Sequence, residues 1–412
     1  MEQLLNHSGF YLLRTPVGSV DNLLALNKDL SPSVLASTMR EVFALPFYQE
    51  AIYVASPELH QELQKWLEGK LSNEKDIDKL ITSLYKYYVR MCTRCTPYGL
   101  FAGSAMGEIS EKSTKISFNQ YQQYYKHSRL DMNYVAELTE YITKLPEVKN
   151  GLKYFINSSL YRTGDSFRYA QFRLKNKNRS YYLTSIKATV FLEKILKTAK
   201  EGATLFDLTN VIIDANISEA MATNYVNKLV SNQILVSELE PTVTGDEFFK
   251  VLIKVLQNLP NTHEIVNNLQ NIERLLSKQD HDIHRYEGIK MAIDENFKTT
   301  SSKDLVQTDL FYNTTANHLN DQLIQKIISQ LQYLLKLRVK SISPNLDAFQ
   351  KAFYERYEDK EIPLTIALDS ENGIGYGKLL KGRGTNLPLV DGLRFEIKQS
   401  ENQKVRWNKI SK

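Results

Sequence analysis

Apolar and polar residues alternate with a period of two in several short stretches of the chain, which is typical of half-buried strands. The first of these predicts a strand that ends at Pro16, because proline cannot continue the pairing. The alternation predicts strands over 10–16, 114–118, 154–156, 160–162, 167–174, 181–183, 233–239 and 306–312.

Apolar residues at helical spacing occupy much of the remaining chain. They predict helices over 32–45, 58–66, 77–89, 188–199, 205–213, 218–230, 315–339 and 349–357, together with a polar helical layer over 246–300 and a helix that opens at Asp131 as its cap. The two patterns together predict an α+β fold of several subdomains with mixed sheets and helices.

Changes of pattern divide the chain into four parts. We expect an N-terminal α+β subdomain (1–152), a strand and winged-helix-like unit (153–245), a helical layer with an α+β subdomain (246–397) and a basic, frayed tail (398–412). A winged helix can bind DNA through its third helix or an extended peptide by strand addition. Because this third helix carries Lys228 as its only base, DNA binding is disfavoured.

Composition narrows the class of protein. The net charge of +5 over 412 residues is too small to demonstrate nucleic-acid binding, although it is compatible with a local basic groove. No run of 18 apolar residues and no signal-peptide layout occurs. Two cysteines are too few for a disulfide framework, so we expect a cytoplasmic protein. Any association with the membrane is expected to occur through partner proteins.

The stretch 85–107 carries the most distinctive chemistry. Arg90 and Arg94 are four residues apart at the end of a predicted helix, so their guanidinium groups are expected to share one face and converge on a phosphate or carboxylate. The alternative is a pair of solvated surface arginines. The segment 96–99 breaks the helix, and 100–107 is small and apolar, as close packing requires.

Other sites are weaker candidates. Arg14 lies at a strand end, where an ordinary edge charge is an equal alternative. Cys92 and Cys95 have redox spacing, but we interpret both as packing residues. The segment 280–284 holds two histidines and two aspartates, and we interpret it as a solvated helix face. The sequence lacks a phosphate-binding loop, a G-x-S-x-G motif and a zinc quartet.

Several motifs distributed along nearly the whole chain resemble those of the N-terminal part of the lantibiotic dehydratases. The string RMCTRCTPYGLFAG at 90–103 is specific, and the remaining motifs are individually weaker. These are YLLRTP at 11–16, ASPEL at 55–59, RLDM at 129–132, QTDL at 307–310 and DSENGIGY at 369–376.

The resemblance implies a tRNA-dependent glutamyl transferase that acts on Ser and Thr hydroxyls of a ribosomal precursor peptide before elimination to dehydroamino acids. Glutamyl-tRNA is the implied co-substrate, and no cofactor or metal is implied. The residues that match positions implicated in glutamylation are Arg14, Arg90, Arg94, Thr96, Asp131 and Asp309. The winged-helix unit resembles the family's leader-peptide recognition element, and its strand edge at Tyr181, Tyr182 and Leu183 fits strand addition.

The chain differs from a complete family member in length, because a complete member continues well beyond residue 412. A truncated chain, one gene of a split system with a separate partner chain, and a remnant are the alternatives. A non-catalytic module that binds the precursor leader is the second functional hypothesis, and the oligomeric state, homodimer included, stays open.

Overall fold

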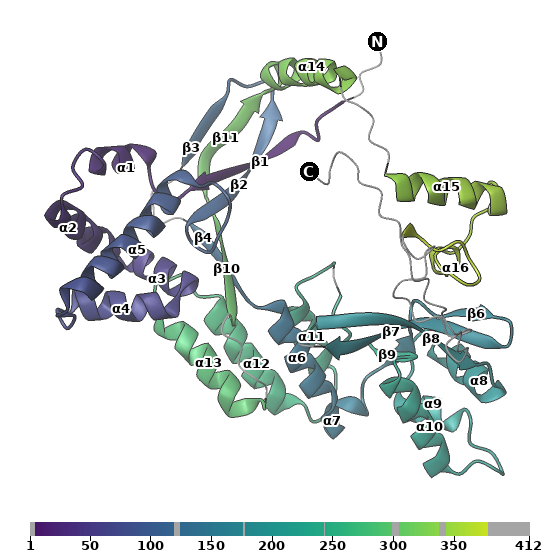
Figure 1. Ribbon diagram of the computed structural model, residues 1–412. Helices are drawn as coiled ribbons and strands as arrows, with labels where there is room; N and C mark the ends of the chain where they lie inside the picture. The colour runs from purple at the N-terminus through teal and green to yellow at the C-terminus, as the bar shows by residue number, and fades with distance from the viewer. Residues whose placement is uncertain are drawn as a thin grey trace, which may run out of the picture. The chain divides into compact units, whose positions relative to one another are not determined.

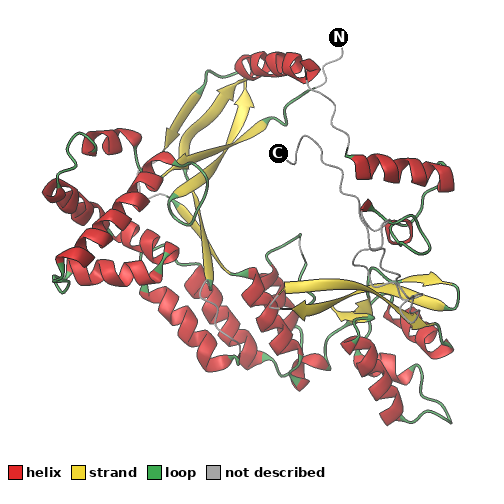
Figure 2. Cartoon of the chain, in the orientation of Figure 1, coloured by secondary structure: helices red, strands yellow, loops and turns green. Residues whose placement is uncertain are grey.

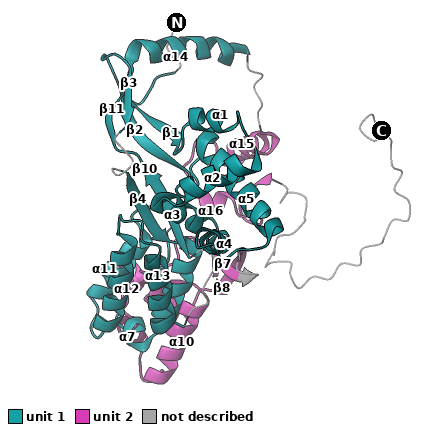
Figure 3. Ribbon diagram, turned by 90° about the vertical axis from the view of Figure 1, so that its left-hand side faces the viewer, with its two compact units in different colours: residues 1–151, 239–339 teal, residues 152–238, 340–412 magenta. Residues whose placement is uncertain are grey.

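The computed structural model describes residues 5–118, 124–175, 178–242, 244–298, 305–337 and 343–377. The chain divides into two compact units, each assembled from two separate segments (Figure 3). Unit 1 comprises residues 1–151 and 239–339, and unit 2 comprises residues 152–238 and 340–412. Both contain helices and strands (Figure 2), so the predicted α+β class is confirmed. The predicted division into four parts stays a prediction, and its last part, the tail 398–412, lies outside the described residues.

The elements follow the labels of Figure 1. Unit 1 contains β1 (Phe10–Pro16), α1 (Val20–Leu26), α2 (Pro32–Phe43), α3 (Pro46–Ala55), α4 (Pro57–Leu67), α5 (Glu74–Thr93), β2 (Ala102–Ser110), β3 (Lys115–Phe118), β4 (Tyr125–Leu130), α6 (Met132–Thr143), α7 (Pro146–Lys149), α11 (Phe248–Gln257), α12 (His263–Leu276), α13 (His284–Asn296), β10 (Val306–Phe311), β11 (Thr314–Asn320) and α14 (Asp321–Leu337). Unit 2 contains β5 (Tyr154–Ile156), β6 (Tyr161–Thr163), β7 (Ser166–Lys175), β8 (Asn178–Lys187), α8 (Val190–Ala199), α9 (Leu205–Asn210), α10 (Glu219–Ser231), β9 (Leu235–Ser237), α15 (Pro344–Tyr357) and α16 (Leu364–Ala367).

Strand β2 is the centre of the sheet in unit 1 (Figure 1). The antiparallel strand β1 pairs along its whole length, from Pro16 opposite Ala102 to Phe10 opposite Glu108. The other edge is shared by two parallel strands, because β10 pairs near the start of β2 and β11 pairs near its end. Antiparallel β4 and β3 then extend the sheet beyond β10 and β11.

The helix α5 packs its apolar face into the core of unit 1. It begins after Asn73, whose side chain accepts a hydrogen bond from the Lys75 N–H, and it is longer at both ends than predicted. Leu84 is fully buried in the core, and burial of such a side chain stabilises the fold by about 2 kcal/mol. Cys92 is buried there as a packing residue, and burial raises the pKa of its thiol. Cys95 is exposed, so its interpretation as a packing residue is wrong.

The predicted helix over 315–339 is wrong in its first six residues. Thr314–Asn320 forms β11, and the helix α14 begins only at Asp321. The strand pairs with β3 on one side and with β2 on the other, and these tertiary hydrogen bonds override a local pattern that is ambiguous for short stretches.

A buried carboxylate, Glu50 of α3, joins three parts of unit 1. Its oxygens accept hydrogen bonds from the Lys126 Nζ of β4 at 2.8 Å and from the Arg285 guanidinium of α13 at 2.6 Å. Tyr286 also donates to it. Burial alone would raise the pKa of Glu50, but its hydrogen bond with His281 and the nearby charges of Lys126 and Arg285 lower that pKa below its ordinary value.

His281 is therefore not part of a solvated helix face, as the sequence had suggested. Its Nδ1 lies 2.7 Å from a Glu50 oxygen, and the residue is in a loop that precedes α13. The helix starts at His284, three residues later, so the two histidines do not share a helical face.

The main sheet of unit 2 has the order β6-β7-β8. Strand β6 is short and leaves the edge of β7 uncovered beyond Arg168. Side chains close that edge, because the Ser159 hydroxyl accepts from the Ala170 N–H and the Gln233 amide bonds both backbone groups of Phe172. The helices α8, α9 and α10 follow as predicted, each capped by a serine or threonine.

A buried ion pair holds the segment after α16 against this sheet. Arg168 of β7 is 2% exposed and donates to both carboxylate oxygens of Asp369, at 3.1 and 2.9 Å. It also donates to Glu371, while the Tyr161 hydroxyl donates to Asp369 at 2.6 Å. Burial alone would raise the pKa of Asp369, but the Tyr161 hydrogen bond and backbone N–H groups lower it to about 2.

Substitution of Glu50 by alanine is expected to destabilise the protein by about 3–5 kcal/mol, because two buried cations lose their counter-charge. The measurement is the free energy of unfolding in urea. The matched control is Glu62→Ala, which removes the exposed Glu62–Lys65 pair and is expected to cost under about 1 kcal/mol. Equal effects of the two substitutions would contradict the role of Glu50.

The stability of unit 2 is expected to fall in acid as Asp369 becomes protonated. Since the pKa of Asp369 is lower in the folded protein than its ordinary value of 3.8, its contribution is complete above that value and is lost as the pH falls toward about 2. The measurement is the free energy of unfolding between these limits. Asp369→Asn should make the curve shallower in this window, and an unchanged slope would argue against the assignment.

Candidate functional site

The two arginines of the central stretch do not share one helical face. Arg90 lies in the last turn of α5, whereas Arg94 is the C-cap residue and has an extended backbone (φ −107°, ψ 116°). The predicted i,i+4 convergence is therefore wrong for Arg94, because the helix ends one residue before it. Arg90 is half-buried, and its guanidinium lies 4.3 Å from the centroid of the Tyr98 ring. Its Nε is buried and has no hydrogen-bond partner in the described part of the chain.

The loop that follows α5 leads directly into β2. Arg94 and Thr96 are exposed in this loop, and within the described ranges neither side chain makes a hydrogen bond or ion pair. Gly99 turns the chain with φ +51°, a conformation that side chains disfavour. At the start of β2, a Cβ on Gly103 would lie 2.7 Å from the Leu310 carbonyl oxygen, so glycine lets β10 approach closely.

Arg14 and Asp309 lie near the same end of β2. Arg14 is opposite Ser104 in the β1–β2 pair, while Leu310, next to Asp309, is opposite Gly103 in the β10–β2 pair. The loop with Arg94 and Thr96 enters β2 at this end. The sheet register thus brings two of the six predicted residues, Arg14 and Asp309, to one region. Arg90, Arg94 and Thr96 lie at the end of α5 and in the loop that leads into β2.

The two predicted acids are connected by two residues that sequence reasoning did not select. The Arg129 guanidinium of β4 pairs with the Asp309 carboxylate and donates to the Gln307 amide oxygen at 3.2 Å. The Gln307 amide nitrogen in turn donates to Asp131 at 2.7 Å. Arg129 lies two residues before Asp131, and Gln307 lies two residues before Asp309. Their place in the same motifs as these acids is the sequence feature that could have identified them.

Asp131 also caps α6, as predicted. One of its carboxylate oxygens accepts from the Asn133 N–H at 2.9 Å, and its own N–H donates to the Leu305 carbonyl. It thereby fixes the start of α6 and one end of the polar chain. Asp309 is 40% exposed at the other end, so its carboxylate is accessible to a ligand.

The predicted peptide-binding residues lie on β8, at the edge of the unit 2 sheet. Leu183 is opposite Ala170 and Tyr181 is opposite Phe172. Because the N–H groups of Ala170 and Phe172 bond to Ser159 and Gln233, these pairs exchange no hydrogen bonds. The backbone groups of Tyr181 and Leu183 therefore point outward from the sheet, and those of Tyr182 point toward β7.

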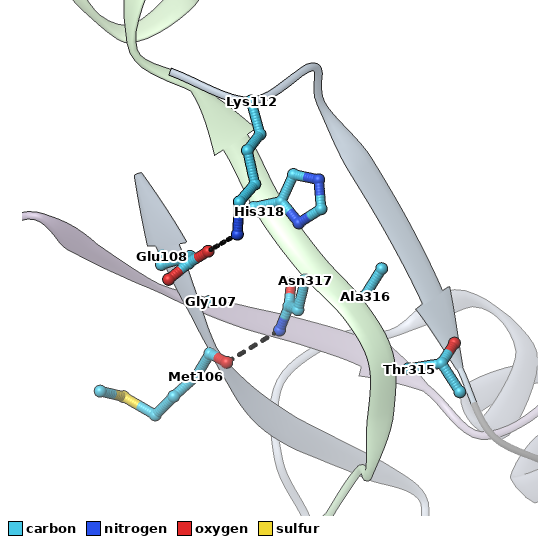
Figure 4. A pocket seen from close by; sticks show the side chains of 8 residues that line it. All are labelled: Met106, Gly107, Glu108, Lys112, Thr315, Ala316, Asn317 and His318. Atoms are coloured by element: carbon cyan, nitrogen blue, oxygen red, sulfur yellow. Dashed lines mark hydrogen bonds and ion pairs between the residues drawn. The ribbon is translucent and has the colours of Figure 1, made fainter. Parts of the chain in front are cut away.

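Grooves lie on both compact units in the described part of the chain. A polar groove of about 540 Å³ runs between β2 and β11 (Figure 4), where the Lys112 Nζ is 3.3 Å from Glu108 and Asn317 donates to the Met106 carbonyl. A more apolar groove of about 370 Å³ lies in unit 2, lined by Thr189, Phe191, Ile212, Ile217, Met221, Ala222, Asn224, Tyr225 and Lys228. Neither groove was predicted from the sequence.

The described residues contain no group of three or more His, Cys, Asp or Glu side chains placed to hold a metal ion. Within the same residues, none of the helices combines the length and apolar character that crossing a membrane requires.

The comparisons with known proteins agree with one another. Residues 44–408 match the family model described as "Lantibiotic dehydratase, N terminus". The subtilin biosynthesis protein SpaB of Bacillus subtilis is 25% identical over 389 residues, which is 91% of this chain and 36% of SpaB. The nisin biosynthesis protein NisB of Lactococcus lactis subsp. lactis is 24% identical, with 80% of this chain and 33% of NisB covered. The chain thus spans about a third of the length of these curated relatives.

Two solved structures share the fold. The tRNA-dependent lantibiotic dehydratase MibB from Microbispora sp. 107891 has a TM-score of 0.69 at 20% identity, covering 89% of this chain and 35% of MibB. The glutamylation domain of TbtB from thiomuracin biosynthesis, bound to 5'-phosphodesmethylglutamycin, has a TM-score of 0.57 at 16% identity, covering 82% of this chain and 41% of that one. Since the family model covers more than half of the sequence, the chain belongs to the lantibiotic dehydratase family and corresponds to its N-terminal region.

Proposed function

We propose that this chain carries residues of a site for tRNA-dependent glutamyl transfer, the first half-reaction of a Ser/Thr dehydratase. A hydroxyl of the precursor peptide attacks the carbonyl carbon of the glutamyl ester on tRNA. An ester to the peptide oxygen forms, the ester to the tRNA ribose breaks, and the hydroxyl proton passes to the released ribose oxygen. The observation that carries the proposal is that the sheet register brings the family-matched Arg14 and Asp309 to one end of β2 in a member of this family.

The arginines suit the negative charges of this reaction. Arg14, Arg94 and Thr96 are exposed around the start of β2 and are accessible to a phosphate or to the oxyanion that develops at the ester carbonyl. A positioned donor to such an oxyanion is typically worth about 3–4 kcal/mol in the transition state. Arg90 stacks on Tyr98, so its planar group is held in place beside the loop.

The acids suit the ammonium group of the glutamate. Asp309 is paired with Arg129, and its carboxylate is partly exposed. We therefore assign it contact with the glutamate ammonium group. Asp131 bonds to Gln307 and to the start of α6, so we assign it a positioning role. Asp309 and Asp131 thus have different proposed roles, although the sequence analysis selected both in the same way.

We infer that β8 and the helices α8–α10 serve as a winged-helix-like unit that binds the precursor leader. An extended peptide can pair with the outward backbone groups of Tyr181 and Leu183, since β7 lies on the other side of β8. The apolar groove along α10 adjoins the residues that follow β8 and is suited to a leader side chain. Because the chain covers about a third of its relatives, glutamylation is assayed with a second chain that supplies the remaining portion of a dehydratase.

Substitution of Arg94 by alanine is expected to weaken glutamyl-tRNA binding and to lower the slope of log K against log salt by about 0.7–0.9, the loss of one phosphate contact. Arg90→Ala should also weaken binding and lower the slope. Arg90→Lys keeps the positive charge and should keep the slope near that of the wild type. The measurement is a filter-binding titration at several salt concentrations. Arg274→Ala, on an exposed position of α12, is the control and should leave the slope unchanged. Failure of the wild-type chain to bind this tRNA, with the complementing chain present, would overturn the proposal.

Leu183→Pro is expected to abolish leader binding, because proline removes an outward N–H without removing a hydrogen bond between β7 and β8. Leu183→Ala keeps that N–H and should bind the leader with an affinity near that of the wild type. The measurement is fluorescence anisotropy of a labelled leader peptide, with the circular dichroism spectrum confirming that each variant is folded. A non-catalytic leader-binding module predicts the same leader result but no tRNA binding, and equal affinity of the Pro and Ala variants would refute strand addition at β8.

A further inference from the structure

A single row of cross-strand partners crosses four strands of the unit 1 sheet. Arg14 of β1 is opposite Ser104 of β2, Ser104 is opposite Phe311 of β10, and Phe311 is opposite Tyr125 of β4. Directly opposed residues point to the same face of a sheet, and neighbouring strands are about 4.8 Å apart. The four side chains therefore form a line about 14 Å long, with an arginine at one end and two aromatic rings at the other.

The aromatic end of the row is open. Phe311 is 41% exposed and Tyr125 is 49% exposed, and their ring centroids lie 6.2 Å apart with an interplanar angle of 42°. The residues on either side alternate as a strand requires, because Leu310 and Lys126 are buried on the opposite face. Two large rings are thus held at fixed positions on an accessible face without covering each other.

The row lies beside the acid to which we assign contact with the ligand. Asp309 precedes Phe311 by two residues on β10, so both side chains share this face about 7 Å apart. In an aminoacyl-tRNA the ester is carried by the ribose of the terminal nucleotide. The terminal base and the reacting carbonyl are therefore joined through one sugar, and a base stacked on Phe311 brings its ester to the region of Asp309.

We propose that Phe311 and Tyr125 form a stacking platform for the unpaired 3′ nucleotides of the aminoacyl-tRNA, with Arg14 contacting the backbone at the other end of the row. Exposed aromatic rings on a sheet face are a common means of binding single-stranded RNA, because every base has a π-face. The small Ser104 leaves room between the ring pair and the arginine. This inference rests on the proposed glutamyl transfer and names the part of the tRNA that the site contacts.

The test compares intact tRNA, with and without its glutamyl group, with the same tRNA trimmed of its unpaired 3′ nucleotides, using the full chain with its complementing chain. The uncharged and trimmed tRNAs both lack the glutamyl group and differ only in those nucleotides. The wild type should bind the uncharged intact tRNA about 10-fold more tightly than the trimmed one. Phe311→Leu and Tyr125→Leu keep an apolar side chain and should reduce that ratio toward one without changing the salt slope. Tyr333→Leu, at a residue 67% exposed on α14, is the control and should keep the wild-type ratio.

A spectroscopic measurement separates stacking from a structural effect. With 2-aminopurine in place of the terminal adenine, binding to the wild type should quench the fluorescence, and binding to Phe311→Leu should not. Equal affinity of the wild type for intact and trimmed tRNA would overturn the platform and leave the proposed transfer standing. An equal loss of both RNAs in Phe311→Leu would also overturn it, whereas no binding of either RNA by the wild type would overturn the proposed function itself.

Discussion

The buried carboxylate of Glu50 determines the geometry of the sheet face on which the candidate site lies. It binds Lys126, the second residue of β4, and Arg285, in the first turn of α13. A lysine that is 2% exposed requires such a partner, because an isolated ammonium group is costly to bury. The pairing fixes the inward face of β4. Since alternate residues of a strand point to opposite faces, it also fixes Tyr125, His127 and Arg129 on the outward face.

The outward face then acquires its chemistry from strands that are distant in sequence. Arg129 binds Asp309 only because β4 and β10 pair in a register that places Gln307 opposite Arg129. A shift of one residue would turn Asp309 and Phe311 toward the core and Leu310 toward solvent. Burial of Leu310 and the Ser128–Thr308 hydrogen bond at 2.9 Å oppose that shift. The apolar core and the polar site are thus determined by the same register.

Local patterns predicted most strands and helices of unit 1 and unit 2, because periodicity, proline and capping residues act within a few positions. Asp131 as a cap is one example. The patterns failed at β11, whose partners lie about 200 residues earlier, and at Arg94, where the helix ends one residue before the expected pair is complete. They could not assign partners, so Arg129 and Gln307 were passed over. The assembly of each compact unit from two separate segments depends equally on contacts that no local window contains.

Two neighbours of β2, the strands β1 and β10, constrain the short stretch of sequence that forms it. Its residues are required by both neighbours, since Gly103 must be small for β10 and the strand must pair with β1 along its length. The loop 94–99 follows α5 and leads into β2 at the end where Arg14 and Asp309 lie. The composition of the candidate site therefore depends on β1 and β10, strands that pair with β2, as well as on the motif at 90–103 that leads into β2.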